Sequence, residues 1–296
     1  MKKFIFTCII LCLITYSFLN PENTINAART GLQIWFQQIL PALLPFSFLS
    51  ILMVKSNFLS SFKGNANLIS CICTLLCGFI FGFPIGAKLS ADFYANGLLS
   101  RKQATILSVA TNNFSPMYIC GFALNTLFSS NKYQTITYIL LYFVPLMIAS
   151  IYLILISANT VNNTAKLDSE FNLNMKTIDE CIMNSFESLI KICGYIVLFS
   201  IISEILIEMH INVFFLQNIE ITNGIQLLSK CDLSESVKYI LAIQTLSFGG
   251  LSGLAQACSI ISQAGLSMHK YIIGKVILSL LLTSLSVIYV FIIRLL

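Results

Sequence analysis

Apolar residues run in long blocks along this chain, and short polar stretches separate the blocks. The blocks cover about positions 4–19, 39–54, 68–83, 104–128, 133–157, 190–209, 236–261 and 271–294. An α-helix needs roughly 20 apolar residues to cross a bilayer, and most of the blocks approach that length. The pattern therefore predicts an all-α, polytopic integral membrane protein with about eight to ten helical segments.

The first block follows Lys2 and Lys3 and resembles the start of a secretory signal peptide. A cleavable signal requires a small-x-small site after its apolar core, and positions 16–21 offer a poor one. We therefore expect 4–19 to remain as a first helix with a cytoplasmic N-terminus.

The composition supports a membrane location. Hydrophobic residues make up 57% of the 296 residues and charged residues only 10%, whereas a soluble protein carries about 25% charged residues. Such a composition excludes a cytosolic enzyme, a disordered regulator and a secreted disulfide scaffold. The net charge of +5 comes from scattered basic residues, so we expect cytoplasmic loops rather than nucleic acid to account for it.

The ten cysteines do not indicate a metal site. No Cys-x2-Cys pair occurs, and the two histidines, His210 and His269, lie far apart. A zinc site needs four ligands at short, paired spacings. The chain also lacks a phosphate-binding Gly-x4-Gly-Lys-Ser/Thr loop and any recognisable catalytic set. We expect no metal, no cofactor, no catalytic residue and no enzymatic activity.

The blocks suggest a single transmembrane domain, 1–296, built from two related, inverted repeats with broken helices. The repeats cover 28–157 and 180–296, and a polar loop at 158–179 joins them. A shift of 150 positions lays 31–52 over 181–202, and a shift of 168 lays 80–102 over 248–270. Repeats with interrupted helices at corresponding places indicate a transporter whose binding site lies at the repeat interface.

The first interruption lies at 82–88. Gly82, Pro84 and Gly86 weaken a membrane helix, and the helix that resumes near Ile85 would direct its N–H groups into a cavity. Such an N-terminus attracts anions, and Lys88 lies in its first turn. We predict a substrate-binding site here. The alternative is a kink for packing, with Lys88 extending to the membrane surface and pairing with Asp92.

The second interruption lies at 247–256. Gly249 and Gly250 again favour non-helical backbone, with Ser252 as a candidate N-cap and Gln256 one turn further on. We predict that these four residues bind substrate from the second repeat. A helix-packing face of small residues is the alternative.

Two further polar groups interrupt the apolar pattern. Asn112, Asn113 and Ser115 are costly in lipid unless partnered, so they are substrate-binding candidates or members of an inter-helix hydrogen bond. Glu220 and Thr222 precede an Asn-Gly pair that typically ends a helix. They are candidates for binding a coupling proton or sodium ion; an interfacial charge is the alternative reading of Glu220.

Four motifs occur in order: Gly-Phe-Pro-Ile-Gly-Ala-Lys-Leu (82–89), Thr-Asn-Asn-Phe-Ser-Pro-Met-Tyr-Ile-Cys-Gly (111–121), Glu-Ile-Thr-Asn-Gly (220–224) and Ser-Phe-Gly-Gly-Leu-Ser-x3-Gln (247–256). Together they resemble the sporulation integral membrane protein YlbJ family, within the wider nucleoside-recognition (gate-domain) group. The likeness spans roughly 30–290. Phe83 stands where the family often has Tyr, and Asn113 adds a second amide.

The resemblance implies a fold similar to concentrative nucleoside transporters and a place in the bacterial cell membrane or the outer forespore membrane. It also implies transport of dipicolinic acid, a small anionic substrate, during sporulation. Lipid is then the surrounding partner, and the coupling ion and a homo-oligomer stay open. A non-transporting scaffold for spore assembly and a nucleoside or other small-molecule carrier are the alternatives.

Overall fold

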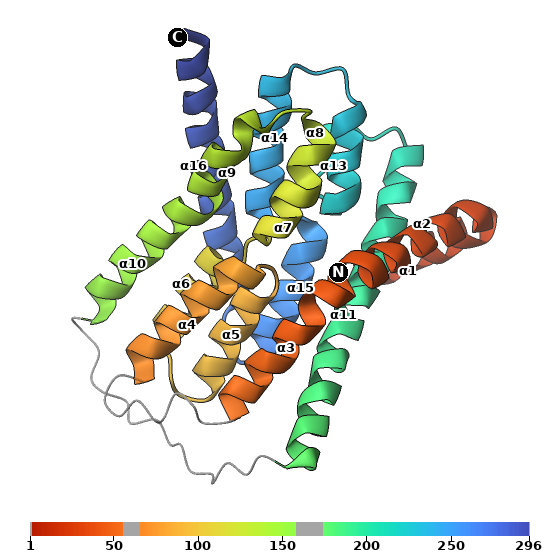
Figure 1. Cartoon of the computed structure of the whole chain (residues 1–296). Coiled ribbons are helices and arrows are strands. Elements are labelled where there is room, and N and C mark those ends of the chain that lie inside the picture. The colour runs from red at the N-terminus through yellow and green to blue at the C-terminus, as the bar shows by residue number, and fades with distance from the viewer. Residues whose placement is uncertain (1, 56–65, 158–173, 296) are drawn as a thin grey trace.

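The computed structural model describes residues 2–55, 66–157 and 174–295, and within these ranges the chain is helical without a strand (Figure 1). The first half contains α1 (Lys2–Leu19), α2 (Pro21–Ile34), α3 (Leu40–Lys55), α4 (Ala66–Phe81), α5 (Ile85–Ala95), α6 (Arg101–Thr111), α7 (Pro116–Tyr118), α8 (Asn125–Leu127), α9 (Gln134–Tyr138) and α10 (Val144–Ser157). The second half contains α11 (Met175–Glu208), α12 (Val213–Leu216), α13 (Ile221–Lys230), α14 (Glu235–Phe248), α15 (Gly250–Gln263) and α16 (Met268–Leu295). Short 3-10 or π-helical turns link several of them, at Trp35–Ile39, Ile119–Leu124, Asn131–Tyr133 and Ile139–Phe143.

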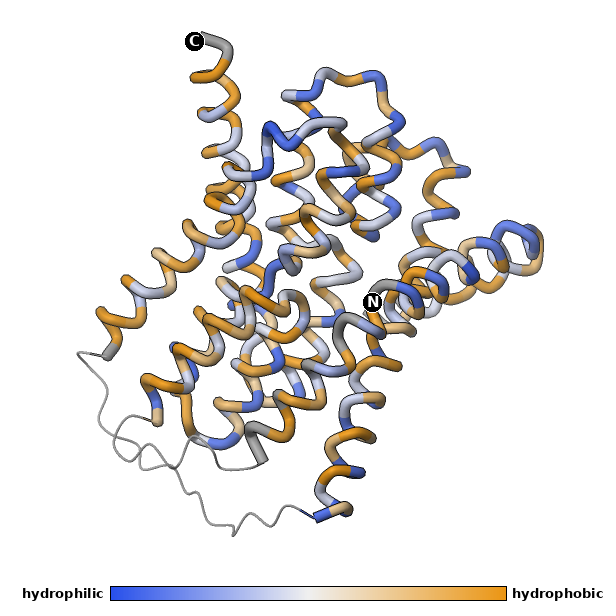
Figure 2. The backbone as a smooth tube through the Cα atoms, in the orientation of Figure 1, coloured by the Kyte–Doolittle hydropathy of each residue, from blue (hydrophilic) through white to orange (hydrophobic). Residues whose placement is uncertain are grey.

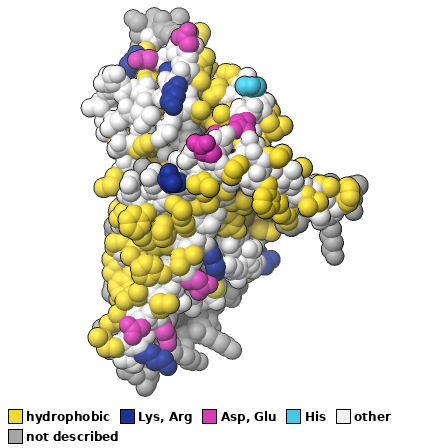
Figure 3. Space-filling model, turned by 90° about the vertical axis from the view of Figure 1, so that its right-hand side faces the viewer, with side chains coloured by type: hydrophobic (Ala, Val, Ile, Leu, Met, Phe, Trp, Pro, Cys, Tyr) yellow, Lys and Arg dark blue, Asp and Glu magenta, His cyan; other side chains and the backbone are white. Residues whose placement is uncertain are grey.

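Four of the described helical stretches are long and apolar enough to cross a membrane: Asn131–Ile156, Met175–Glu208, Glu235–Gln263 and Met268–Ile293. The 34 residues of α11 extend about 51 Å, which exceeds the ~30 Å hydrocarbon core. Hydrophobic residues follow the helices along most of their length (Figure 2), and hydrophobic side chains cover a broad area of the surface (Figure 3). The predicted all-α polytopic membrane protein is confirmed.

Helix α11 begins earlier than the apolar pattern indicated. The Asn174 side chain accepts a hydrogen bond from the Thr177 N–H at 2.8 Å and so caps the helix start. Positions 174–179 of the predicted loop therefore belong to a helix and its cap, and positions 158–173 lie outside the described residues. Helix α2 packs against α11 through Gly31, whose added Cβ would lie 3.1 Å from the Val197 Cα.

A helical hairpin forms the centre of the first half. Helices α4 and α5 pack side by side around a turn at 82–84, and Gly82 adopts a left-handed φ of 74° there. The two arms approach closely because a Cβ on Gly78 would lie 3.1 Å from the Gly86 Cα. Sequence reasoning predicted the resumption near Ile85, and α5 begins there.

A broken helix follows the hairpin. Ser100 and Gln103 form a capping box that starts α6, with Gln103 N–H donating to Ser100 Oγ and Ser100 N–H donating to Gln103 Oε1. The helix ends at Thr111, and the chain resumes a helix at Pro116 with Ser115 as N-cap. Residues 112–115 thus leave the helical conformation between two apolar helical segments.

The second half contains a turn and an interrupted helix of its own. A short α12 and a turn at 217–220 lead into α13, and α14 and α15 form one 29-residue apolar stretch interrupted at Gly249. Ser234 is the N-cap residue of α14, without the side-chain cap hydrogen bond that Ser100 makes at the start of α6. The two-repeat arrangement and its shifts of 150 and 168 stay predictions.

The two glycine-rich breaks differ in the form of their backbone. Gly82 lies in a turn between two packed helices, whereas Gly249 interrupts one helix, as positions 112–115 do in the first half. Sequence matching aligned the two breaks because both are rich in glycine, a property that reports a non-helical backbone without specifying its shape.

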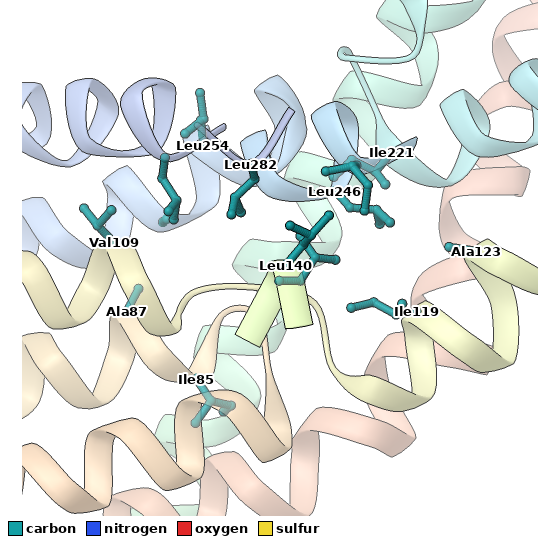
Figure 4. Close-up of a cluster of buried hydrophobic side chains, with 14 of the residues drawn as sticks. Ile85, Ala87, Val109, Ile119, Ala123, Leu140, Ile221, Leu246, Leu254 and Leu282 are labelled. Atoms are coloured by element: carbon teal, nitrogen blue, oxygen red, sulfur yellow. The ribbon is translucent and has the colours of Figure 1, made fainter. Parts of the chain in front are cut away.

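Hydrophobic side chains from both halves share one core. Ile85, Val109 and Leu140 come from the first half, and they lie close to Leu246 and Leu282 from the second (Figure 4). Helix α16 packs against α14 and α6, and Gly274 allows the second contact, since its added Cβ would lie 2.7 Å from Val109 Cγ2.

Gly86→Ala tests whether the hairpin must lie directly against α6. A Cβ at Gly86 would lie 2.5 Å from the Thr111 carbonyl oxygen, a backbone atom that cannot rotate away. We expect a loss of stability of about 3 kcal/mol or more, measured as a lower Tm of the detergent-purified protein.

Gly194→Ala is the matched control, because no atom lies within 4 Å of its added Cβ on α11. Alanine is favoured over glycine in a helix interior, so we expect unchanged or slightly higher stability. Equal effects of the two substitutions would contradict the close approach at Gly86.

Candidate functional site

Lys88 and Gln256, predicted as substrate ligands from different halves of the chain, line one pocket. The pocket has a volume of about 190 Å³ and lies between α5, α11 and α15. Its lining residues are Lys88, Ala91, Asp92, Ala95, Ser188, Lys191, Ile192, Tyr195, Gln256, Ser259, Ile260, Gln263 and Ala264. Two lysines and one aspartate are its charged side chains, and the Lys191 ammonium is bound to the Glu187 carboxylate at 2.7 Å.

The Lys88 ammonium is held loosely in this pocket. It forms an ion pair with Asp92, one turn along α5, at a distance of 3.8 Å between Nζ and Oδ2. The side chain of Lys88 is 15% exposed and that of Asp92 is 31% exposed. A long, partly exposed pair of this kind contributes little to stability, so the ammonium remains available to an anion.

Gln256 presents an unused acceptor in the same region. Its Nε2 donates a hydrogen bond to Ser252 Oγ at 3.0 Å, and among the described residues its buried Oε1 has no hydrogen-bond partner. A buried polar atom without a partner is costly, and a ligand donor or water at this position would satisfy it.

The structure corrects the predicted role of Ser252. The N-cap of α15 is Gly249, at a left-handed φ of 91°, and Ser252 lies within the first turn of the helix. The N–H groups of Leu251 and Ser252 donate to the carbonyls of Asn218 and Ile219, at 2.7 and 3.0 Å. These N–H groups are therefore used to join α15 to the turn before α13 and do not face an anion.

The turn of the first hairpin meets both broken helices. A Cβ on Gly82 would lie 2.3 Å from the Ser115 nitrogen, so this glycine is pressed against the break in the first half. The Phe83 ring lies 3.7 Å from the position of a Cβ on Gly253, at the start of α15. Pro84 serves as the N-cap residue of α5. The predicted breaks at 82–88 and 249–256 thus adjoin one another in space.

Asn112 and Asn113 face helix α16 rather than the pocket. Both are buried, and Asn112 Nδ2 donates to the Tyr271 hydroxyl at 2.7 Å. Asn113 Nδ2 donates to the carbonyls of Ala110 and Leu141, at 2.8 and 2.9 Å. Of the two interpretations left open by the sequence, the contacts agree with an inter-helix hydrogen-bonding role.

Lys275 completes this buried cluster, and sequence reasoning overlooked it. Its ammonium donates to the Asn112 carbonyl at 3.0 Å and to Asn113 Oδ1 at 3.1 Å, and the residue is 1% exposed. A signal was present, because Lys275 lies inside the apolar block 271–294. An ionisable residue within a membrane segment is by default a candidate for function.

Glu220 and Thr222 lie at the start of a helix, not at its end as the Asn-Gly pair suggested. Glu220 is the N-cap of α13, and its Oε2 accepts a hydrogen bond from the Asn223 N–H at 2.9 Å. Close packing instead explains the glycine at position 224, since its added Cβ would lie 2.4 Å from the Gln217 carbonyl oxygen.

Neither coupling candidate is among the described residues that line the Lys88 pocket. Glu220 is 6% exposed, and Thr222 Oγ1 lies 3.2 Å from the Tyr118 hydroxyl in the first half. Both side chains are therefore enclosed at a second contact between the two halves of the chain.

These features define a class of protein: a polytopic integral membrane protein whose interrupted helices and hairpin turns meet in its interior. The chain is similar to the sporulation integral membrane protein YlbJ of Bacillus subtilis (strain 168), with 23% identity over 326 aligned positions. The alignment covers 87% of this chain and 75% of that relative. No protein-family model matches the chain, and no solved structure matches it significantly.

The comparison confirms the resemblance on which the sequence interpretation relied. Together with the membrane-crossing helices, it supports the prediction of an integral membrane protein.

Asn113→Ala tests the importance of the buried cluster. The substitution removes a partner from the Lys275 ammonium and leaves two carbonyl groups without their amide donor. We expect a loss of about 3 kcal/mol or more in the free energy of unfolding, because several buried polar groups lose partners together. Thermal unfolding in detergent measures the change.

Asn26→Ala is the control for this substitution, since Asn26 is exposed within α2. An exposed asparagine of this kind should change stability by less than about 0.5 kcal/mol. Comparable losses in both variants would show that the Asn113 cluster has no special importance.

Proposed function

We propose that this chain is a secondary carrier of a small organic anion, with dipicolinic acid crossing the outer forespore membrane during sporulation as the specific candidate. The observation that carries the proposal is the shared pocket of Lys88 and Gln256. A cation from one half and an amide from the other meet there. Binding at the interface of two such halves is how many secondary transporters couple occupancy to movement.

The chemistry of the pocket fits a small, flat dianion. Lys88 supplies positive charge, Gln256 and Ser188 supply polar contacts, and Tyr195 contributes an aromatic ring to the lining. Lys191 also lines the pocket, but its ammonium is paired with Glu187. Drug-sized ligands occupy about 300–1,000 Å³, so a pocket of about 190 Å³ suits a smaller molecule. The choice of dipicolinic acid within this class rests on the family resemblance.

Two alternatives make different predictions. A non-transporting scaffold for spore assembly needs the close-packed glycines but has no use for a cation at Lys88. A carrier of nucleosides or other uncharged molecules needs the polar side chains but gains nothing from the Lys88 charge. The effect of the Lys88 charge on uptake therefore separates the anion carrier from both alternatives.

The decisive experiment measures uptake of labelled dipicolinate by vesicles that contain only this protein. Lys88→Ala should weaken substrate binding by about 10- to 100-fold, as expected for loss of one hydrogen bond to a charged group. Lys88→Arg should retain part of the activity, because the charge survives although the guanidinium is larger and planar.

Lys102→Ala is the matched control, because Lys102 is an exposed lysine at the start of α6. It should leave uptake unchanged. Uptake of dipicolinate that is insensitive to Lys88→Ala would remove Lys88 from the binding site. Absence of uptake by the wild-type protein, together with a normal dipicolinate content when it replaces YlbJ in Bacillus subtilis spores, would favour the scaffold.

Asp92→Asn should have the opposite effect on affinity. Asp92 pairs with Lys88 and also repels an entering anion, so removal of its charge favours substrate binding. We expect the KM for uptake to fall by about two- to fivefold, in keeping with a partly exposed ion pair. An increased KM would mean that Asp92 positions Lys88 instead of competing for it.

A further inference from the structure

The ammonium of Lys275 occupies the broken segment of α6, away from the substrate pocket. Asn112 is the C-cap of α6, and its carbonyl is one of the groups released where the helix ends. Lys275 reaches this carbonyl from α16, and its Cε lies 3.9 Å from the position of a Cβ on Gly249, the residue that interrupts the other long helix. One side chain thus lies against both breaks.

Among the described residues, two oxygen atoms accept hydrogen bonds from the ammonium, and neither comes from a carboxylate. The ion pairs among the described residues involve Lys88 and Lys191, and Lys275 takes part in neither. Burying a charge without an opposite charge is expensive, so polar partners must compensate for it. The C-terminal end of α6 provides part of this compensation, because its carbonyls carry partial negative charge.

The hydrogen bonds of Asn113 fix the orientation of this oxygen set. Both bonds donated by its Nδ2, to Ala110 and Leu141, turn its Oδ1 toward Lys275. Asn112 adds a further buried oxygen, Oδ1, which has no hydrogen-bond partner among the described residues. The residues where α6 is broken thus supply two oxygens bound to Lys275 and one unsatisfied oxygen.

Such a set is what a small cation requires. In secondary transporters, carbonyls of unwound segments and the C-terminal ends of half-helices coordinate the coupling sodium ion or proton. Hard cations prefer oxygen ligands, and amide and carbonyl oxygens are typical ones. In this chain a covalently attached ammonium fills the position that a free ion would take.

We propose that Lys275 is a built-in cation that replaces a bound sodium ion, so that the carrier works without sodium. The proposal rests on the carrier function proposed above and specifies its ion requirement. It makes a prediction about the protein alone as well: removal of the side chain should create a sodium site that the wild-type protein lacks.

The first experiment measures thermal unfolding of the purified, detergent-solubilised full chain in sodium chloride and in choline chloride at equal concentration. The wild-type protein should show the same Tm in both salts. Lys275→Ala should have a lower Tm in choline and regain about 2 °C or more in sodium, because a ligand that binds only the folded state stabilises it. Lys270→Ala, an exposed lysine on the same helix, should respond to neither salt.

Lys275→Ser is the second variant, because its hydroxyl adds one more oxygen to the set. Stabilisation of the wild-type protein by sodium would overturn the proposal. So would folded Lys275 variants that gain nothing from sodium. If neither variant can be purified, the wild-type measurement still decides, since a built-in cation leaves no room for a sodium response.

The second experiment measures dipicolinate uptake by wild-type vesicles in the same two salts. Equal uptake in sodium and choline supports a built-in cation, and uptake that requires sodium contradicts it while leaving the carrier function intact. Absence of uptake in both salts would instead count against the carrier function. The unfolding measurements then still test Lys275, because they do not depend on transport.

Discussion

Backbone groups that leave a helix inside a membrane must find their partners within the protein, because lipid offers none. Each unsatisfied group costs several kcal/mol there. The chain breaks its helices at 82–84, 112–115 and 249, and backbone groups at the second and third of these breaks bind to other segments. The Asn112 carbonyl accepts from Lys275, the Phe114 carbonyl accepts from the Tyr142 hydroxyl, and the N–H groups after Gly249 donate to the turn before α13. The interrupted helices therefore satisfy their free backbone groups by hydrogen bonds to other segments in the interior.

This constraint explains why glycine recurs at the contacts between elements. A polar backbone group can reach a neighbouring backbone only if no side chain intervenes. Gly82 against Ser115 and Gly224 against Gln217 are both approaches that a Cβ would prevent. The main role of these glycines is therefore to allow close contacts rather than to make the chain flexible. The breaks can then be both non-helical and fully packed.

The sequence allowed the membrane class, the helix start at Ile85 and the meeting of Lys88 with Gln256 to be predicted. The lengths of the apolar blocks and the positions of glycine and proline are local properties of the sequence, so they can be interpreted without knowledge of the fold. The predicted placement of Glu220 at a helix end was wrong because Asn-Gly commonly ends a helix. Glycine is required at 224 by the nearby Gln217 backbone, and this contact is visible only in the folded structure. Lys275 was readable as an ionisable residue in an apolar block, but its partners lie more than 160 positions away along the chain.

Lys88 and Lys275 therefore occupy different electrostatic settings. Lys88 has a carboxylate neighbour at 3.8 Å and an opening toward a pocket, so its partner can be exchanged when an anion arrives. Lys275 has only fixed oxygens of the backbone and of Asn113 around it, and it is enclosed. An exchangeable charge suits a group that binds and releases cargo. A fixed charge suits a group that holds the broken helices together while cargo binds and leaves. The two roles require the lysines to lie apart, on α5 and α16.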